Sequence, residues 1–272
     1  MQLKMFCLCL DNDLLKSVKN LNYIPVGLGK NSFSNEWWRD NTGENISSKN
    51  QFYGEYSFHY WFWKNYLNKI KDNKDWIGFC AYRRFWSKNE LKSDKEILNL
   101  KEEVIDNVPE KWKNYEVILG NYQDVSDFKL SKLLKYGKIA FLKNPKVIFK
   151  NKRNIKFQFD MFHGVGVLDK AIDLLDDENR EDFKNYINNN SSYNQGNMFV
   201  TNSTEIISKY YQTIFSWLTK CEQIFGLELQ GYGKQRMYAF LAERFLPYWF
   251  NKNCKVLEWP IIFHDLKKDL LK

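Results

Sequence analysis

The chain has 272 residues, of which 44% are hydrophobic and 27% are charged, with a net charge of +8. This composition excludes an intrinsically disordered chain, and the length suits one large domain or two small ones. No apolar run approaches the roughly 20 residues of a membrane-spanning helix, the N-terminal run is too short for a signal peptide, and the lysines are scattered rather than gathered into the stripe typical of nucleic-acid binding.

Two short apolar runs near the N-terminus are typical of buried strands. The run "LKMFCLCL" covers residues 3–10 and stops at the polar tripeptide "DND", and the run "YIPVGLG" covers residues 23–29. A polar loop follows. Apolar residues at helical spacing then predict a helix over residues 51–70, capped by Ser47, Ser48 or Asn50.

The rest of the chain continues the alternation of strands and helices. We expect strands in "DWIGFCAYRRFW" (75–86), "YEVILGNYQD" (115–124) and "GNMFVTN" (196–202). Helices are predicted over the charged segment 88–112, from about Leu168, over 204–225 with Thr204 as cap, and over about 233–250. The pattern predicts an α/β fold, a mostly parallel sheet flanked by helices, with a helical C-terminal part.

Polar residues follow three of the predicted strands: "DND" at 11–13, "YRR" at 82–84 and "NYQD" at 121–124. Ligands of open α/β sheets bind beyond the carboxyl ends of the strands. These three tripeptide or tetrapeptide motifs are therefore the first candidates for a site.

The segment "DNTGENISSKN" (40–50) contains hydroxyls, amides and a lysine and ends at a predicted helix start. The free backbone N–H groups of a helix start favour the binding of an anion such as a diphosphate. An ordinary capping loop is the alternative. The aromatic residues that follow, part of an aromatic content of 17%, either fill the core or form platforms for sugars or bases.

The arginine pair in "AYRRF" offers a bidentate fork for phosphate oxygens, and a structural ion pair is the alternative for either arginine. Phosphate-loop, dinucleotide-binding, zinc-protease and serine-hydrolase signatures are all missing from the sequence. Five cysteines without a C-x-x-C pair suit a reducing cytosol and predict neither disulfides nor a zinc site. Four of them, Cys7, Cys9, Cys80 and Cys221, lie in apolar runs and are expected to be buried. His163 is the best functional candidate of the three histidines, and carboxylates that could act as a base are Asp124, Asp127, Asp160 and Glu243.

Several segments together resemble one bacterial domain family. "DNTGENISSKN", "EYSFHYWFWKN" and "WIGFCAYRRFW" have the order and spacing of its first half, and "QFDMFH", "NMFVTNSTEIISKYYQTIFSWL" and "YAFLAERFL" resemble its second half. Members of the family occur in capsular and exopolysaccharide synthesis loci and are regarded as glycosyltransferases.

The resemblance implies a GT-A-like fold and transfer of a hexose, galactose in pyranose or furanose form, from a nucleotide sugar such as a UDP-hexose. The acceptor would be a growing capsular, lipopolysaccharide or other surface glycan, as an oligosaccharide or on a polyprenyl diphosphate lipid. We expect one domain over residues 1–272, with a nucleotide-sugar-binding half (1–125) and an acceptor-side helical half (126–272). It would be cytoplasmic, with contact to the inner face of the cytoplasmic membrane.

The polar loop 40–50 would hold the phosphates and sugar hydroxyls of the donor, and the aromatic helix after it would pack under the loop and keep it rigid. The expected site residues combine the matched positions with the strand-end motifs. For catalysis they are Asp160, Glu243 and Arg83; for donor binding they are Asp11, Asp13, Asp40, Asn45, Lys49, Asn50, Glu55, Tyr82 and Arg84; for acceptor binding they are His163, Asn197 and Arg244.

Two features concern a metal. Where many GT-A enzymes have a metal-binding Asp-x-Asp, the comparable strand end here has "YRR", so arginine would neutralise the leaving diphosphate and a divalent cation (Mn²⁺ or Mg²⁺) would be dispensable. "DND" nevertheless spells Asp-x-Asp, after the first strand. The family's histidine before Y-R-R is replaced by Ala81, so a role for that histidine is lost here. A non-catalytic glycan-binding module is the alternative function.

Overall fold

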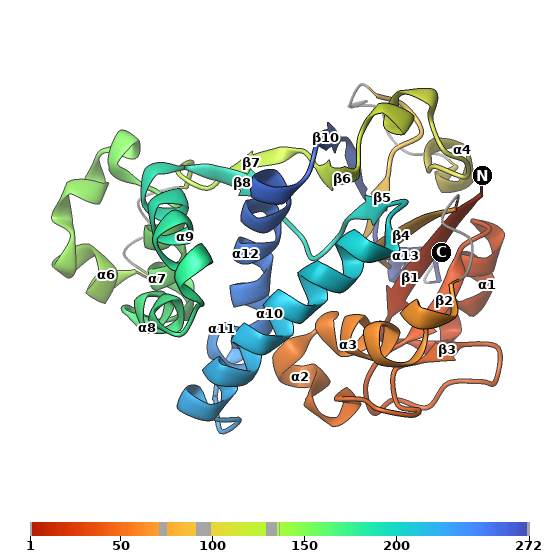
Figure 1. Ribbon diagram of the computed structural model, residues 1–272, viewed down its shortest axis with the longest axis horizontal. Coiled ribbons are helices and arrows are strands. Elements are labelled where there is room, and N and C mark those ends of the chain that lie inside the picture. The colour runs from red at the N-terminus through yellow and green to blue at the C-terminus, as the bar shows by residue number, and fades with distance from the viewer. Residues whose placement is uncertain (1, 71–74, 91–98, 129–134, 136, 271–272) are drawn as a thin grey trace. The chain divides into compact units, whose positions relative to one another are not determined.

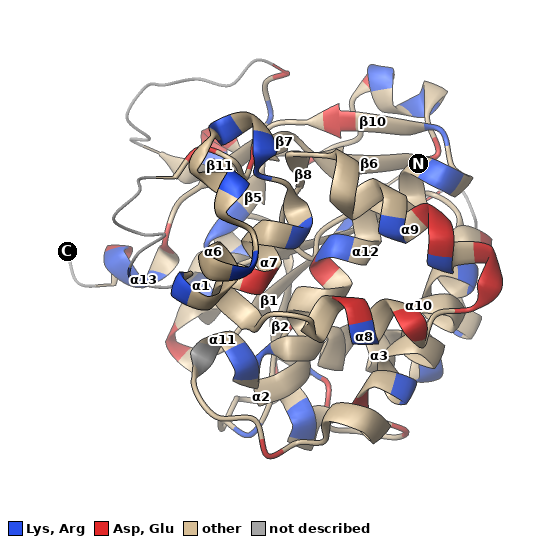
Figure 2. Ribbon diagram, turned by 90° about the vertical axis from the view of Figure 1, so that its left-hand side faces the viewer, with Lys and Arg blue, Asp and Glu red and all other residues tan. Residues whose placement is uncertain are grey.

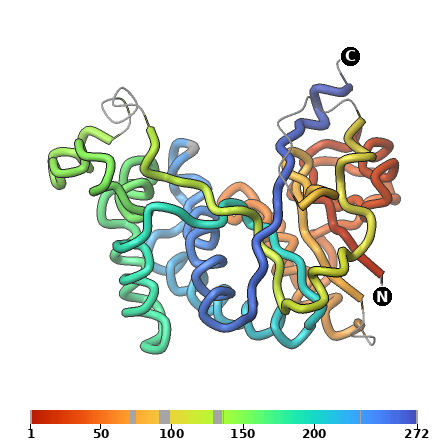
Figure 3. Tube along the Cα trace, turned by 90° about the horizontal axis from the view of Figure 1, so that it is seen from above, coloured from red at the N-terminus to blue at the C-terminus, as the bar shows by residue number. Residues whose placement is uncertain are grey.

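The computed structural model describes residues 2–70, 75–90, 99–128, 135 and 137–270. The chain forms two compact units. The first comprises Met1–Asn121, Gly196–Gln212 and Phe250–Lys272, and the second comprises Tyr122–Gln195 and Thr213–Trp249. The chain leaves the first unit twice and returns to it twice, as the trace in Figure 3 shows.

The first unit contains a nine-stranded sheet whose main path runs β10-β6-β9-β4-β1-β2-β3 (Figure 1). Neighbouring strands from β4 to β3 are parallel, as are β6 and β10, whereas β9 is antiparallel to both of its neighbours. The β5 strand pairs antiparallel with β4 and β11. The strands are β1 Leu3–Cys9, β2 Ile24–Gly27, β3 Trp38–Arg39, β4 Trp76–Ala81, β5 Arg84–Trp86, β6 Val117–Gly120, β9 Val200–Thr201, β10 Val256–Trp259 and β11 Ile261–Phe263.

Helices and 3₁₀ turns complete the first unit. They are η1 Asn12–Leu14, α1 Leu15–Asn20, η2 Ser47–Lys49, α2 Asn50–Tyr53, α3 Tyr56–Asn65, η3 Leu67–Lys69, α4 Leu100–Glu103, η4 Glu110–Asn114 and α13 Leu266–Asp269, with the first part of α10 Thr204–Phe225 and the end of α12 Met237–Asn253.

Alternating side chains of β1 pack on the two faces of the sheet. Phe6 meets Phe58 and Phe62 of α3, with ring centroids 5.7 and 5.3 Å apart. Cys7 and Cys9 belong to the core on the opposite face. Because both faces are covered, the strand is apolar along most of its length, as expected for a central parallel strand.

The prediction of one continuous helix over residues 51–70 is wrong, because this segment forms two helices, α2 and α3, and the 3₁₀ turn η3. Gly54, with φ 55° and ψ −131°, separates α2 from α3, a conformation that a side chain would make costly. The predicted caps are wrong as well, since the caps of η2 and α2 are Ile46 and Lys49, and neither makes a side-chain capping bond. The polar loop therefore does not lead into a long helix with a free anion-binding start.

The described part of segment 88–112 holds only α4 and η4, so a helix over the whole segment is wrong there, and residues 91–98 lie outside the described residues. The charged residues of this segment supported a helix by propensity alone, without an apolar face. Asn12 and Asp13 of "DND" lie in the 3₁₀ turn η1, and the short helix α1 that follows was not predicted.

The second unit is mainly helical, with the two-stranded sheet of β7 Tyr122–Asp124 and β8 Ser192–Asn194. Its helices are α6 Lys138–Lys143, α7 Ile155–His163, α8 Val167–Asp173, α9 Asp177–Asn189 and α11 Tyr232–Gln235, the 3₁₀ turns η5 Pro145–Ile148 and η6 Lys150–Lys152, and the remaining parts of α10 and α12. The helix expected from Leu168 exists as α8, but the preceding helix α7 was not predicted. The α10 helix is capped by Ser203 rather than Thr204, since the Ser203 hydroxyl accepts from the N–H of Ile206 at 3.2 Å.

The predicted α/β class is confirmed, with a mainly parallel central sheet flanked by helices. The cysteines expected inside, Cys7, Cys9, Cys80 and Cys221, are all buried. Lysines and arginines are distributed over many elements, as expected from the sequence (Figure 2). In the part of the chain that the structure describes, no helix combines the length and apolarity needed to span a bilayer.

Candidate functional site

The carboxyl ends of β1, β2, β3 and β4 lie at one edge of the sheet, here called the carboxyl edge, because these strands are parallel neighbours. The chain segments that leave this edge begin at Leu10, Leu28, Asp40 and Tyr82. Open α/β sheets bind ligands at such an edge. Two of the predicted polar motifs, "DND" and "YRR", lie there, whereas most of "NYQD" forms β7 of the second unit.

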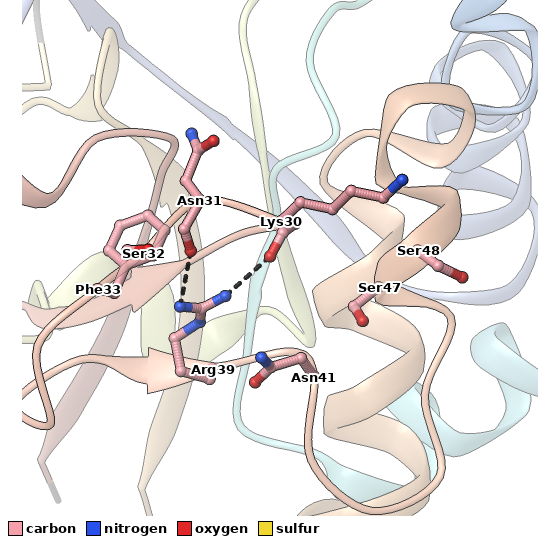
Figure 4. Close-up of a pocket in the computed structure, with 9 residues that line it drawn as sticks. Lys30, Asn31, Ser32, Phe33, Arg39, Asn41, Ser47 and Ser48 are labelled. Atoms are coloured by element: carbon pink, nitrogen blue, oxygen red, sulfur yellow. Dashed lines mark hydrogen bonds between the residues drawn. The ribbon is translucent and has the colours of Figure 1, made fainter.

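A cleft of about 470 Å³ opens beyond the ends of β2 and β3. Its lining combines two cations with hydroxyl and amide groups and contains no carboxylate. We call it the basic cleft, and it is lined by Gly29, Lys30, Asn31, Ser32, Phe33, Arg39, Asn41, Ser47 and Ser48 (Figure 4).

Arg39 is fixed in the wall of the basic cleft. Its guanidinium donates to the carbonyls of Asn31 at 3.0 Å and Gly29 at 2.8 Å, and it lies 4.5 Å from the ring centroid of Phe33. Bonds to carbonyls orient the guanidinium without neutralising its charge. Figure 4 shows the Lys30 side chain extending toward the segment that carries Ser47 and Ser48. The cleft thus offers positive charge and hydrogen-bond donors to an anion.

Below the basic cleft, Asp40 is buried and ties the turn after β2 to α3. It accepts from the N–H of Gly29 at 3.2 Å and from the hydroxyl of Ser57 at 2.6 Å. Asn50 donates to the same hydroxyl and to the carbonyl of Gly54, both at 2.8 Å. Burial raises the pKa of Asp40, while the bonds from Ser57 and Gly29 oppose that rise. The predicted donor-binding residues Asp40 and Asn50 therefore position the turn from beneath.

Gly29 itself has a φ of +69°, and a Cβ there would lie 3.0 Å from Oδ1 of Asn50. Both the backbone conformation and the close approach of Asn50 require glycine at this position. The turn that carries Lys30 thus depends on residues of the predicted site that do not themselves line the basic cleft.

The polar loop lies on α3, as expected from its neighbourhood in the sequence. The indole N–H of Trp61 donates to Thr42 at 2.9 Å, and the Tyr60 hydroxyl donates to Glu44 at 2.7 Å. Asn65 both donates to the Glu44 carbonyl at 2.8 Å and accepts from the Glu44 N–H at 3.1 Å. The loop is also closed on itself, since Asn45 accepts from the Ser47 hydroxyl at 2.9 Å.

Three predicted residues come together around a cavity of about 10 Å³ at the carboxyl edge, which has room for about one water molecule. Glu55, Arg84 and Asn197 line it, together with the ends of β1 and β4 at Leu8 and Ala81. Glu55 precedes α3, Arg84 begins β5, and Asn197 leads into β9. Sequence order gave no indication that Asn197, predicted as an acceptor residue, belongs to the same unit as the donor residues.

The C-terminal segment covers the other strand-end groups. Nε of Arg83 lies 2.8 Å from Oδ2 of Asp265, and Nζ of Lys267 lies 2.8 Å from Oδ2 of Asp11. The backbone N–H of Leu266 also donates to the Tyr82 carbonyl at 3.2 Å. The bond from Lys267 holds the pKa of Asp11 below its usual range.

Adjacent arginines thus have different surroundings: Arg83 is ion-paired with Asp265, and Arg84 lines a cavity. Asp13 lies exposed on η1, and its N–H donates to Asp11. Among the described residues no group of three or more His, Cys, Asp or Glu side chains could hold a metal ion. A cation at "DND" would have to replace Lys267 at Asp11.

The remaining predicted residues lie in the second unit. Asp160 pairs with Lys156 at 2.8 Å and accepts from the N–H of Gly166 at 3.2 Å. His163 contacts the Gly233 carbonyl through Nδ1 at 2.7 Å and stacks on Phe240 with centroids 4.1 Å apart. Burial, aided by the nearby charge of Arg244, lowers the pKa of His163 to about 3.

Arg244 is 2% exposed, bonds to Glu243 at 2.7 Å and Gln158 at 2.8 Å, and lies between aromatic rings. Through Gln158 it joins α12 to α7. The two predicted residues Glu243 and Arg244 are therefore paired with each other within this unit.

Sequence reasoning missed Lys30, Asn31, Arg39, Asp265 and Lys267. The first two follow the end of the predicted strand 23–29, so the rule that selected "DND" and "YRR" could have found them. Nothing in the sequence signals that the C-terminal segment returns to the carboxyl edge, because this contact joins residues more than 180 positions apart.

These features define an α/β protein with a basic cleft at the carboxyl edge of its sheet. The family model described as "Domain of unknown function (DUF4422)" matches residues 9–254, and the chain belongs to this family. None of the curated proteins compared with the chain matches it.

Among solved structures, the chain is similar in fold to one titled "WbbM bifunctional glycosytransferase apo structure", with a TM-score of 0.66 and 20% sequence identity. The match covers 97% of this chain and 45% of that one, so this chain spans less than half the length of that protein.

Proposed function

We propose that this chain is a glycosyltransferase that takes its sugar from a nucleotide donor. The observation that carries the proposal is the basic cleft, in which Lys30 and the fixed guanidinium of Arg39 face hydroxyl and amide groups without a carboxylate. Such a lining suits the diphosphate of a nucleotide sugar. The fold similarity to a structure titled as a bifunctional glycosyltransferase supports the same class.

The finer proposal follows the family resemblance of the sequence. The donor is a UDP-hexose, such as UDP-galactose, and the acceptor is an oligosaccharide or a lipid-linked surface glycan, as in capsule or lipopolysaccharide synthesis. Residues 1–125 would hold the donor, and residues 126–272 would hold part of the acceptor. The reaction would take place in the cytoplasm, at the inner face of the cytoplasmic membrane where the acceptor is lipid-linked.

In the proposed reaction an acceptor hydroxyl oxygen bonds to the anomeric carbon while the bond from that carbon to the diphosphate breaks. Lys30 and Arg39 of the basic cleft would stabilise the leaving diphosphate, which requires preorganised positive charge. Arg83, Arg84 and Lys49, which the sequence assigns to the same role, do not line that cleft and would have to reach the diphosphate from outside it. For an inverting reaction the hydroxyl proton passes to a carboxylate, for which Asp160 and Glu243 are the candidates. Arg83 must exchange Asp265 for the phosphate to act in this way.

A divalent cation is dispensable in this proposal, because the cationic side chains supply the neutralisation and Lys267 already pairs with Asp11. If Mn²⁺ or Mg²⁺ is used, Asp11 and Asp13 are the residues that would hold it, and Lys267 must move away.

Thermal denaturation in the presence of UDP, GDP, CMP and their sugars tests the proposal, with manganese and with chelator. A ligand at about 100 times its dissociation constant adds about 2.7 kcal/mol to the free energy of unfolding. We expect a raised midpoint with uridine nucleotides that persists in chelator and is lost in Lys30→Ala and Arg39→Ala.

Lys184→Ala is the matched control, since Lys184 is an exposed lysine of the second unit, outside the cleft. Absence of a shift with every nucleotide would contradict the donor class and favour a non-catalytic glycan-binding module.

A further inference from the structure

A second cleft, of about 530 Å³, adjoins the basic cleft in the first unit. The two clefts share Phe33, Arg39 and Asn41, so they meet at β3. The second cleft differs in chemistry, since tryptophan and tyrosine rings form much of its wall. We call it the aromatic cleft and define it by Trp38, Trp61, Tyr66, Asn41, Thr42 and Asn65. Two cations, Arg39 and Lys69, also line it.

The rings of the aromatic cleft are held rigidly and remain partly exposed. Phe58 stacks on Trp61, with centroids 5.5 Å apart and an angle of 17° between the planes. Trp38 meets Trp61 and Tyr66 edge to face, at 6.0 and 4.8 Å. The rings of Trp38, Trp61 and Tyr66 are only half-buried, whereas Trp37, which also lines the cleft, is buried. Because packing already fixes them, a ligand would not have to immobilise these side chains.

Polar groups accompany the rings. The Thr42 oxygen accepts from the Trp61 indole at 2.9 Å, which leaves the Thr42 hydroxyl proton available to a ligand. Asn65 is fixed by the polar loop, and Asn41 is exposed. Hydroxyl and amide groups both donate and accept, so they suit the hydroxyl groups of a sugar, and the guanidinium of Arg39 is already bonded to two backbone carbonyls.

We propose that the aromatic cleft is a glycan-binding subsite for an oligosaccharide. A pyranose ring has an apolar face of C–H groups and a rim of hydroxyls, which matches half-exposed rings bordered by amides and a hydroxyl. The volume of the cleft lies within the range of small-molecule sites, about 300–1,000 Å³. Two cations line each cleft, but the basic cleft has only the ring of Phe33 whereas rings form much of the aromatic cleft, so the anionic ligand is assigned to the basic cleft.

Because the two clefts adjoin, the subsite could bind the acceptor of the proposed reaction. An oligosaccharide in the aromatic cleft would lie beside a donor in the basic cleft, as expected for a part of the acceptor glycan. That role rests on the proposed function, whereas the binding of glycan to the aromatic cleft does not.

Intrinsic fluorescence and calorimetric titration of the full chain with maltotetraose, cellotetraose and a galactose tetrasaccharide test the inference, without nucleotide. We expect at least one tetrasaccharide to bind and Trp61→Ala to raise its Kd about tenfold or more, as for other aromatic anchors of binding sites. Trp61→Phe keeps a ring and should lose less. Trp63→Ala, on the same helix but outside the cleft, should bind as wild type does.

Circular dichroism detects a folding defect in either variant. If Trp61→Ala unfolds, the Kd of Trp61→Phe is compared with that of wild type instead. The inference is overturned if no tetrasaccharide binds, or if Trp61→Ala and Trp63→Ala weaken binding equally. It is also overturned if Trp61→Ala removes the thermal shift with UDP, since the cleft would then hold the nucleobase. Failure of the proposed function looks different: wild type shows no shift with any nucleotide while the tetrasaccharide still binds.

Discussion

The side chains of the predicted site are of two kinds. Some line a cavity, and others fix the position of a turn beside the basic cleft. Arg84 and Glu55 line a cavity, whereas Asp40 and Asn50 fix the Gly29 turn from below. The sequence pattern selected all four because they share the family's segments, and a pattern cannot tell a contact residue from a positioning residue. That distinction depends on burial, which for Asp40 is complete.

The two buried histidines predict how stability depends on pH. Burial lowers the pKa of His59 to about 4, and the His59 ring contacts the Tyr211 hydroxyl at 2.6 Å. His163 is similarly lowered, to about 3. In the unfolded chain each histidine takes up a proton near its ordinary pKa of about 6.5, and the folded chain does not. Stability is therefore fully present above about pH 6.5 and is lost on acidification toward the folded values.

We expect the free energy of unfolding to fall by roughly 1 kcal/mol per buried histidine between pH 7 and pH 5.5. Urea denaturation at a series of pH values measures this slope. His59→Gln should have a shallower slope than wild type in this range and the same slope between pH 7 and 8. A variant with the wild-type slope throughout would show that His59 is protonated in the folded chain.

At the scale of elements, the sequence was most informative where a local pattern determines the contact. The hydrogen bonds of Trp61 and Asn65 to the polar loop join residues about 20 positions apart, and the sequence predicted that α3 supports this loop. The break at Gly54 was missed, because the apolar spacing continues across it. The contact of the C-terminal segment with "YRR" could not be predicted, since it depends on where β11 joins the sheet.

That contact provides a test of the two interpretations of Arg83. If Arg83 stabilises the leaving diphosphate, Arg83→Ala should lower turnover by about 100-fold or more, while Asp265→Asn, which frees the guanidinium, should keep it. The ion pair is partly exposed, with Arg83 47% accessible, so each variant should lose no more than about 1 kcal/mol of stability.

Turnover of UDP-hexose with an oligosaccharide acceptor, read beside a urea denaturation curve, measures both effects. Equal turnover in wild type and Arg83→Ala would remove Arg83 from the mechanism and leave it a structural ion pair. The structural alternative therefore predicts the same small loss of stability in both variants and no change in rate.

For the whole molecule, alternating strands and helices predicted the α/β class, and the carboxyl ends of the strands predicted where a site lies. The strand expected in 196–202 exists as β9, but its antiparallel pairing and the whole of β11 were beyond this reasoning, because two or three residues carry no periodicity and antiparallel pairing is decided by distant partners. The division into units could not be predicted for the same reason, because it depends on distant contacts. The chain forms part of the second unit over Tyr122–Gln195 and belongs to the first unit again from Gly196, so that Asn197 lies in the first unit.

The buried cysteines report on the folding of each unit. Cys7, Cys9 and Cys80 lie in the first unit and Cys221 in the second, all four buried, while Cys254 is half-buried with its pKa raised by burial to about 12. We expect five reactive thiols in denaturant and labelling of the four buried ones at least about 1,000-fold slower in the native chain, because it requires opening of the core. Peptide mass spectrometry after timed labelling measures each rate. Rapid native labelling of Cys7 or Cys80 would contradict the packing of β1 against β4.

The same labelling in rising concentrations of urea shows the order of unfolding. Loss of protection at Cys221 before Cys7 would show that the helical unit unfolds first, and simultaneous loss would show one cooperative transition.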